Sequence, residues 1–552
     1  MTLTVQDLQN LRFSALEAAK EEWAQVARRL GGYCDRIDAY MRSPLKHEWS
    51  GDAADKAQQR MSRLRENFQF GGQECALIET TLDGVITELR AQQKALHQAL
   101  DEAIRKGYKI APTGEVVCAD EGDIPTGEPD AVPAKERERR GLEENIFSVL
   151  RNAMETDARY REALSRLRVD RGLSVDNLES MRDAADISKI AGATVGLESA
   201  PAKGTDPKKA RDWWNGLSAE EQEEQLALNP GVIGNLDGIP ARTRDKANRV
   251  NLDRLVAMSP KDAPDEVKER YEGYKAIRER LVSDEGKEPE ALLLGIGPEG
   301  QGRAILSYGD PDTADNVAAY VPGFSTTLKD VGKEDGDRAE NVWNSANQAD
   351  HQHKTASIVW LGYDAPQGPE VADTERGKRG GADFGNFLGG IQATHQGDRP
   401  HVTAIGHSYG SFTVGQAAQR EGGIPADDII LVGSPGTGAQ KAEDLGVGAD
   451  RVWVGAADSD LVTHAPSKSE SAWGIATGPI NGGIAHLTDP HELWFGQDPA
   501  SDDFGGNRFS VAFGNPKSSH SNYFNPEGGD SLDNMGKIVT GHPEKVTFQR
   551  RR

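Results

Sequence analysis

Residues 401–420 have the sequence HVTAIGHSYGSFTVGQAAQR, in which an apolar run precedes Gly-His-Ser-Tyr-Gly and a helical stretch follows it. The pattern predicts a buried strand over His401–Ile405 and a helix over Ser411–Arg420. A nucleophile elbow requires this strand–turn–helix setting, because the sharp turn holds a serine in a strained conformation with its hydroxyl above the sheet. The flanking glycines relieve crowding there. Ser408 is therefore the candidate nucleophile, and the alternative is a loop without chemistry.

Short apolar runs of strand length alternate with helical stretches after Pro289, which predicts βαβ units and a mostly parallel sheet. We expect an α/β domain over 208–552, made of a helical N-terminal part at 208–288 and a catalytic sheet domain at 289–552. The predicted strands are Ala291–Leu294, Ala304–Tyr308, Val317–Val321, Thr355–Leu361, His401–Ile405, Asp428–Val432, Arg451–Val454 and Arg508–Phe513.

A serine needs a base to become nucleophilic, and the base needs a carboxylate that orients it. In folds with this elbow the acid and then the histidine follow the serine, each after a later strand. Asp460 is preferred as the acid because it follows the strand at 451–454 and precedes an apolar pair, and Asp458 is the alternative. His520 is preferred as the base because it follows the last predicted strand. The remaining candidate histidines are His464, His486, His491 and His542.

The tetrahedral intermediate of such a reaction needs two hydrogen-bond donors for its oxyanion. We expect one to be the backbone N–H of Tyr409, the residue after the nucleophile. The other is assigned to the backbone N–H of Phe324, because Val321-Pro322-Gly323 ends the third strand and the glycine allows close approach. A plain Pro-Gly turn is the alternative explanation.

Some motifs suggest a cofactor or a metal but lack the required context. Gly295–Gly300 matches GxGxxG, yet a strand rather than a helix follows it, so we predict a hairpin turn and no dinucleotide. The histidine groups at 351–353 and 486–491 lack a recognised ligand spacing. We expect no cofactor and no metal. Gly433-Ser434-Pro435-Gly436 is predicted to shape the rim of the site.

Residues 1–110 carry two amphipathic patterns, and we expect them to form an antiparallel helical hairpin. Apolar side chains recur every three or four positions from Val5 to Tyr40, and in a near-heptad rhythm from Ala57 to Leu100. Two such helices joined by a short turn would bury both apolar stripes.

The region 111–190 is predicted to be a linker plus a further helix. Residues 111–134 are rich in proline, glycine and acids, which indicates a loop, and a helix is expected from Ala134 to near Asp186. A break rich in glycine, alanine and proline at Ala191–Pro207 then separates this region from the α/β domain.

The chain of 552 residues has 64 basic and 88 acidic side chains, a net charge of −24. This excess of acid argues against nucleic acid as a partner, which needs local clusters of lysine and arginine. No segment reaches the roughly 18 apolar residues of a membrane helix, and residues 1–23 lack the pattern of a signal peptide. The three cysteines form no CxxC pair, so neither a disulfide framework nor a structural zinc site is expected.

Several motifs in residues 213–552 occur together in this order. They are Trp213-Trp214 with Asn229–Asn248, Val321-Pro322-Gly323, Trp360-Leu361-Gly362-Tyr363, the Ser408 elbow and His520. With these motifs, the region resembles an actinobacterial α/β-hydrolase family related to cutinase-like esterases and lipases. The resemblance implies a Ser-His-Asp hydrolase, with Ser408, His520 and Asp460 in those roles, and it implies no particular substrate.

The turn at Trp49-Ser50-Gly51 resembles the WXG-type helical hairpins associated with type VII secretion. The export signature of that system is absent after the second helix, since Tyr108 is followed at its spacing by Pro112. Two locations stay open: cytoplasmic, from the lack of a signal peptide, or exported by a type VII-like route. Self-association or a secretion partner would then use the N-terminal helices.

The sequence thus favours a serine hydrolase, esterase- or lipase-like, that cleaves a small acyl-ester or lipid-like substrate through an acyl-enzyme. The alternative is a type VII secretion-associated binding or toxin-type protein with a vestigial hydrolase domain.

Overall fold

The computed structural model describes residues 3–42, 49, 51–118, 131–166, 200–257, 263–368, 370, 373–464, 492–511, 519–527 and 529–552. The chain divides into two compact units. The helical unit comprises Met1–Met41, Arg63–Ser199 and Glu223–Asn229, and the sheet unit comprises Arg42–Ser62, Ala200–Gln222 and Pro230–Arg552.

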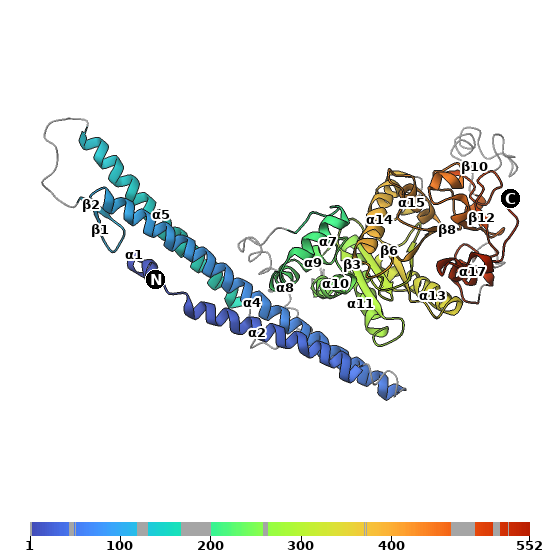
Figure 1. Ribbon diagram of the computed structural model, residues 1–552, viewed down its shortest axis with the longest axis horizontal. Helices are drawn as coiled ribbons and strands as arrows, with labels where there is room; N and C mark the ends of the chain where they lie inside the picture. Colours follow the sequence, from blue (N-terminus) through green and yellow to red (C-terminus); the bar gives the residue numbers. More distant parts are fainter. Residues whose placement is uncertain are drawn as a thin grey trace. The chain divides into compact units, whose positions relative to one another are not determined.

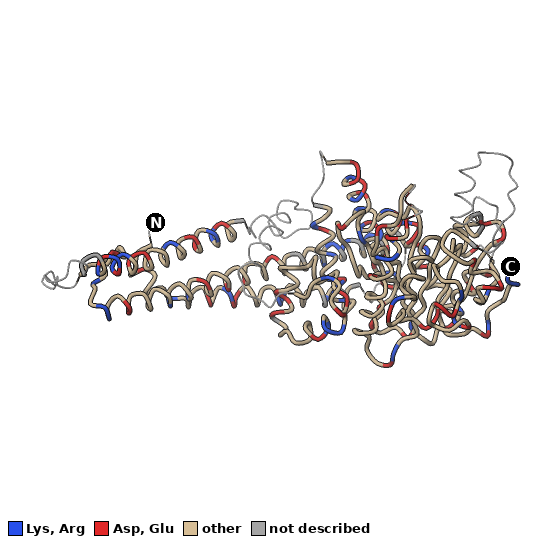
Figure 2. The backbone as a smooth tube through the Cα atoms, turned by 90° about the horizontal axis from the view of Figure 1, so that it is seen from above, with Lys and Arg blue, Asp and Glu red and all other residues tan. Residues whose placement is uncertain are grey.

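Long helices form most of the helical unit (Figure 1). They are α2 (Ser14–Ile37), α4 (Asp52–Arg105) and α5 (Ala131–Arg166), and the short α1 (Val5–Gln9) precedes them. Figure 2 shows acidic and basic residues interspersed along these helices, an arrangement that allows ion pairs between neighbouring helices and turns.

Contacts between distant positions give the direction of each helix. Lys20 pairs with Asp83, whereas Cys34, later in α2, contacts the carbonyl oxygen of Arg65, earlier in α4. Tyr160, near the end of α5, donates a hydrogen bond of 2.9 Å to Glu88 in the middle of α4. Glu138, near the start of α5, pairs instead with Lys106 just after α4. Both α2 and α5 therefore run antiparallel to α4.

The structure differs from the sequence prediction at the first helix, which was expected to run unbroken from Val5 to Tyr40. It is interrupted between α1 and α2, where Gln93 of α4 donates hydrogen bonds to the carbonyl oxygens of Leu8, Gln9 and Leu11. These bonds satisfy carbonyl groups that a continuous helix would otherwise have paired.

Part of the loop predicted at 111–134 also has regular structure. The strands β1 (Tyr108–Ile110) and β2 (Val116–Cys118) pair as an antiparallel hairpin. The guanidinium of Arg139 in α5 donates to the carbonyl oxygen of Val116 at 2.9 Å, which attaches the hairpin to that helix. The part of the further helix predicted beyond α5, toward Asp186, lies outside the described residues.

Five helices among the described residues lie between α5 and the sheet in the chain, and one of them, α8, is divided between the two units. They are α7 (Pro207–Gly216), α8 (Ala219–Leu228), α9 (Pro230–Ile233), α10 (Ala241–Ala257) and α11 (Asp265–Ser283). Across both units, no helix among the described residues combines the length and the apolar character needed to cross a membrane.

The sheet has eight strands in the order β12-β9-β8-β7-β5-β6-β4-β3. The strands from β12 to β6 are parallel, whereas β4 runs antiparallel to both β6 and β3. Their bounds are β3 (Ala291–Gly297), β4 (Arg303–Tyr308), β5 (Asn316–Val321), β6 (Thr355–Leu361), β7 (His401–His407), β8 (Asp428–Val432), β9 (Val452–Gly455) and β12 (Asn507–Arg508). Seven of the eight predicted runs coincide largely with a strand of this sheet, so the expected mostly parallel sheet after a helical region is confirmed. The prediction for Arg508–Phe513 is wrong in its bounds, because the observed strand β12 ends at Arg508, and residues 512–513 lie outside the described residues.

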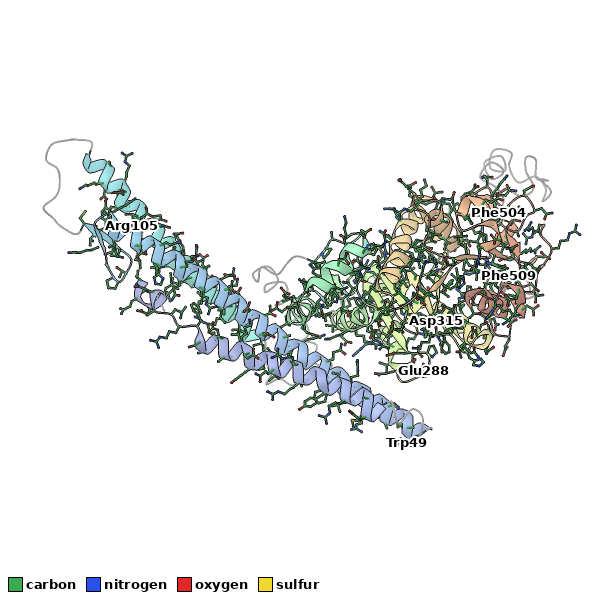
Figure 3. All side chains as sticks on the ribbon, viewed as in Figure 1. Trp49, Arg105, Glu288, Asp315, Phe504 and Phe509 are labelled. Atoms are coloured by element: carbon green, nitrogen blue, oxygen red, sulfur yellow. The ribbon has the colours of Figure 1, made fainter. Side chains whose placement is uncertain are left out.

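Helices cover both faces of the sheet (Figure 1). On one side α13 (Glu334–Ala349) packs with α17 (Asp530–Val539), and on the other α14 (Glu375–Thr394) packs with α15 (Tyr409–Ala418). Because both faces are covered, each residue of β5 is buried. Phe504 and Phe509, labelled in Figure 3, belong to the same core and are almost inaccessible to solvent. The carboxyl ends of the parallel strands meet at one edge, where the candidate site lies.

Candidate active site

Ser408 stands between β7 and α15 in a conformation that L-residues rarely adopt. Its φ is 55° and its ψ is −128°, and its N–H donates to the carbonyl oxygen of Val432 at 3.0 Å. The flanking glycines are required here, since a Cβ at Gly410 would lie 2.1 Å from the carbonyl oxygen of Val321. The predicted strand–turn–helix setting and its backbone strain are thus present in the structure.

Asp460 and His520 are brought together at the same edge of the sheet. The imidazole Nδ1 lies 3.1 Å and 2.9 Å from the two carboxylate oxygens. Asp460 is fully buried and also accepts hydrogen bonds from Tyr523 Oη at 2.7 Å and from the N–H of Val462 at 2.9 Å. Burial alone would raise the pKa of Asp460, but the hydrogen bonds from His520 and Tyr523 hold it below its usual value. The carboxylate is therefore ionised and able to orient an imidazole.

Asp458, the alternative acid, has a different partner. Its carboxylate pairs with Arg508 at 2.7 Å and lies farther, 3.8 Å, from Arg552. Its side chain is 61% exposed, in contrast to that of Asp460. The structure therefore puts Asp458 in an ion pair with the C-terminal region and Asp460 beside the imidazole.

The imidazole of His520 lies beside the carboxyl ends of β7 and β8. A Cβ on Gly433, which follows β8, would lie 3.0 Å from Asp460 Oδ2 and 3.0 Å from His520 Nδ1. The neighbouring residue Val432 is the one that accepts the N–H of Ser408. Within the described part of the chain, Ser408 Oγ forms no hydrogen bond to His520. Hydrogen bonds of this kind are often long in ligand-free sites and shorten when substrate binds.

The two expected oxyanion donors lie on segments that touch each other. A Cβ on Gly323 would lie 2.7 Å from Ser408 Cβ and 3.0 Å from the nitrogen of Tyr409, so only glycine allows this approach. The hydroxyl of Tyr363 donates to the carbonyl oxygen of Pro322 at 2.8 Å and holds the 322–324 segment in place. Neither the N–H of Tyr409 nor that of Phe324 has a backbone acceptor among the described residues. The assignment of these two N–H groups as oxyanion donors stays a prediction.

Two side chains at this site were not singled out from the sequence. Tyr523 links the acid and histidine loops, because its hydroxyl contacts Asp460 and also accepts the N–H of Ala457 at 3.0 Å. His407 precedes the nucleophile, and its Nε2 lies 2.7 Å from the carbonyl oxygen of His520. The one feature of the sequence that could have identified them as site residues is their position, since each lies within three residues of a predicted catalytic side chain.

Of the other candidate histidines, only His542 has a side chain among the described residues. His542 lies near Asp350 and Glu544. His486 and His491 lie outside the described residues, and for His464 only the backbone is described, within a 3₁₀ turn.

The segment that matches GxGxxG lies among the described residues. The GxGxxG match forms the turn between β3 and β4, with Gly297 opposite Arg303 in an antiparallel pair, so the predicted hairpin is confirmed. Among the described residues, no cluster of three or more His, Cys, Asp or Glu side chains is placed to hold a metal ion.

A family model described as "Alpha/beta hydrolase" matches residues 297–470, which contain the elbow serine and the buried aspartate. The sheet unit has the α/β-hydrolase fold. This places the protein in the hydrolase superfamily at the level of fold, and it agrees with the strand order and with the elbow after β7.

Mycobacterial proteins also match this chain. Uncharacterized protein Rv2079 of Mycobacterium tuberculosis is 32% identical over 381 residues, which are 63% of this chain and 57% of the relative. Uncharacterized protein Mb0988c of Mycobacterium bovis is 32% identical over 174 residues, 30% of this chain and 61% of the relative. The chain thus spans little more than half of the first relative. These matches support the expected actinobacterial α/β-hydrolase family.

Proposed function

We propose that this hydrolase is a serine esterase, lipase-like in chemistry, that cleaves a small acyl ester through an acyl-enzyme on Ser408. The observation that carries the proposal is the buried Asp460 carboxylate bonded to His520 Nδ1 beside a serine with φ of 55°. A carboxylate in this position holds the imidazole in the tautomer with its proton on Nδ1, which leaves Nε2 free to accept a proton.

Acylation would proceed as Ser408 Oγ attacks the ester carbonyl and His520 Nε2 takes the hydroxyl proton. The Asp460 carboxylate stabilises the imidazolium while the N–H groups of Tyr409 and Phe324 bind the oxyanion. Collapse of the intermediate breaks the ester C–O bond, and the imidazolium gives its proton to the departing alcohol. Water then attacks the acyl-enzyme with the same imidazole as base, which releases the acid and regenerates Ser408.

Reaction with a fluorophosphonate probe tests the proposal, followed by mass spectrometry of the labelled peptide. Wild-type protein is expected to label at Ser408 and to hydrolyse p-nitrophenyl esters, with Ser408→Ala reducing turnover on the order of 10⁴–10⁶-fold. Ser411→Ala is the matched control, because Ser411 is a buried serine three positions later whose hydroxyl only donates to Gly406. Wild-type protein that neither labels nor hydrolyses any ester of the series would refute the function.

A profile over acyl chains of increasing length then identifies the substrate class. Phe495 bears on this choice, since its ring packs 5.4 Å from that of Tyr409 and 4.4 Å from that of Phe412. Its side chain is buried in the hydrophobic core of the sheet unit.

A second proposal concerns the N-terminal helices, which we suggest take part in secretion or partner binding in the manner of WXG-type hairpins. It is supported by Trp49, which stands between α2 and α4 in the chain, is labelled at the hairpin end in Figure 3, and is 46% exposed. Gly51 follows with φ of 104°. Export in the native host is the test: Trp49→Ala is expected to lower the secreted fraction, and equal secretion of the variant and the wild type would contradict it.

A further inference from the structure

His407 connects the strand that carries the nucleophile to the loop that carries the base. It is the last residue of β7, its side chain is buried, and its Nε2 lies 2.7 Å from the carbonyl oxygen of His520. A carbonyl oxygen only accepts, so the proton must lie on His407 Nε2 and the imidazole must be the donor. The two residues are 113 positions apart in the chain.

The surroundings of His407 keep its ring in one place. The centroid of the His407 ring lies 4.8 Å from that of the His520 ring. The rings of Tyr523 and Phe524 pack edge-on with the His407 ring, at centroid distances of 6.2 Å and 5.7 Å. Tyr320 contacts the ring from β5 at 6.5 Å. Burial first, and then the nearby charges of His520 and Arg338, place the pKa of His407 well below its usual value. The ring is therefore neutral and does not repel the imidazolium that forms on His520.

The contact from His407 uses the backbone of His520 and not its side chain. Nδ1 of His520 thus remains with Asp460, and the hydrogen bond from His407 does not occupy Nε2. The same loop is also tied to the acid loop through Ser519 and Ser459, whose hydroxyl oxygens are 2.6 Å apart, and to α13 through the bond from Asn341 to the carbonyl oxygen of Phe524. Among these contacts, the one from His407 comes from the residue adjacent to Ser408.

We propose that His407 is a positioning residue, which donates a hydrogen bond to the carbonyl of His520 and thereby sets the imidazole at its working distance from Ser408. The inference rests on the proposed serine hydrolase function. Its consequence is that the geometry of the elbow and that of the base are coupled by one hydrogen bond. A displacement of about 1 Å in a reacting group can cost on the order of 10²-fold in rate.

A pair of substitutions separates the donor from the packing. His407→Met and His407→Gln have side chains of nearly equal length, and only glutamine carries an N–H that can reach the carbonyl oxygen. We expect kcat for a p-nitrophenyl ester to fall about 10–100-fold in the methionine variant, with KM changed by less than about 3-fold, and to recover largely in the glutamine variant. His407→Phe replaces the methionine variant if that protein does not fold.

The matched control is His401→Met, at the other end of the same strand. The ring of His401 also hydrogen-bonds to a backbone carbonyl, that of Val539 at 2.9 Å, but far from the elbow along β7. We expect this variant to lose stability and keep kcat, with thermal unfolding measured for every variant. Equal kcat in wild type and His407→Met, or equal losses in the methionine and glutamine variants, would overturn the positioning role. An inactive wild type would instead refute the proposed function itself.

Discussion

Replacing Tyr523 with phenylalanine removes one oxygen atom that connects the acid loop to the histidine loop. The hydroxyl donates to Asp460 Oδ2 at 2.7 Å and accepts from the N–H of Ala457 at 3.0 Å, and all three residues are buried. A hydrogen bond to a charged group contributes about 1.5–3 kcal/mol, and a buried N–H left without an acceptor costs about 1–3 kcal/mol. We expect Tyr523→Phe to destabilise the sheet unit by about 3 kcal/mol.

The assay is urea unfolding followed by tryptophan fluorescence, with the transition of the sheet unit analysed separately because a protein of two units need not unfold in one step. At a slope of about 3 kcal/mol per M, the midpoint should fall by about 1 M. Tyr274→Phe is the control, since the hydroxyl of Tyr274 is also buried but makes only a 3.3 Å bond to the carbonyl oxygen of Gly297. Its expected effect is about 1 kcal/mol.

The pH dependence of the same variant gives an independent check. Because the pKa of Asp460 is below its usual value in the folded protein, its ionised form contributes stability above about pH 4 that is lost as the pH falls further. Loss of the Tyr523 donor should raise that pKa and move the loss to higher pH. Two results together would refute this role of the Tyr523 hydroxyl. They are an equal shift of the urea midpoint in Tyr523→Phe and Tyr274→Phe, and a loss of stability at low pH that occurs at the same pH in Tyr523→Phe as in wild type.

The remaining predictions concern the same edge of the sheet and the far end of β7. Asp460→Asn should lower kcat by about 10⁴-fold and Asp458→Asn by less than about 3-fold, and similar losses in steady-state ester hydrolysis would contradict the assignment of the acid. Gly433→Ala should lower kcat while the circular dichroism spectrum stays that of wild type, because its φ is 57° and a Cβ would press on the imidazole; unchanged turnover would show that the contact is harmless. Burial of His401 opposes its protonation, but hydrogen bonds to Asp428 and a carbonyl raise its pKa, so its stabilisation is present at acid pH and lost as the pH rises through that raised value. Unfolding midpoints between about pH 6 and 9 should therefore decline less in His401→Met than in wild type, and parallel curves would exclude this linkage.

Much of the sheet unit could be predicted because its strands are buried on both faces. A run such as Thr355–Leu361 is mostly apolar and buried throughout, and its bounds match those of β6. The elbow could be predicted because the strand, the turn and the helix are consecutive in the chain. The helical unit was predicted less completely from the sequence. Apolar periodicity identified its helices, but the break after Gln9 involves hydrogen bonds from Gln93, more than eighty positions away.

The sequence by itself determined most of the strands and the elbow around Ser408, because hydrophobic periodicity and turn residues act over a few neighbouring positions. Tertiary structure decided which aspartate meets the imidazole, since Asp458 is exposed and pairs with Arg508 whereas Asp460 is buried beside His520. It also decided the contacts of Tyr523 and His407, which span 63 and 113 positions. Such contacts arise only when the sheet order brings distant loops to one edge, and no local pattern encodes that order.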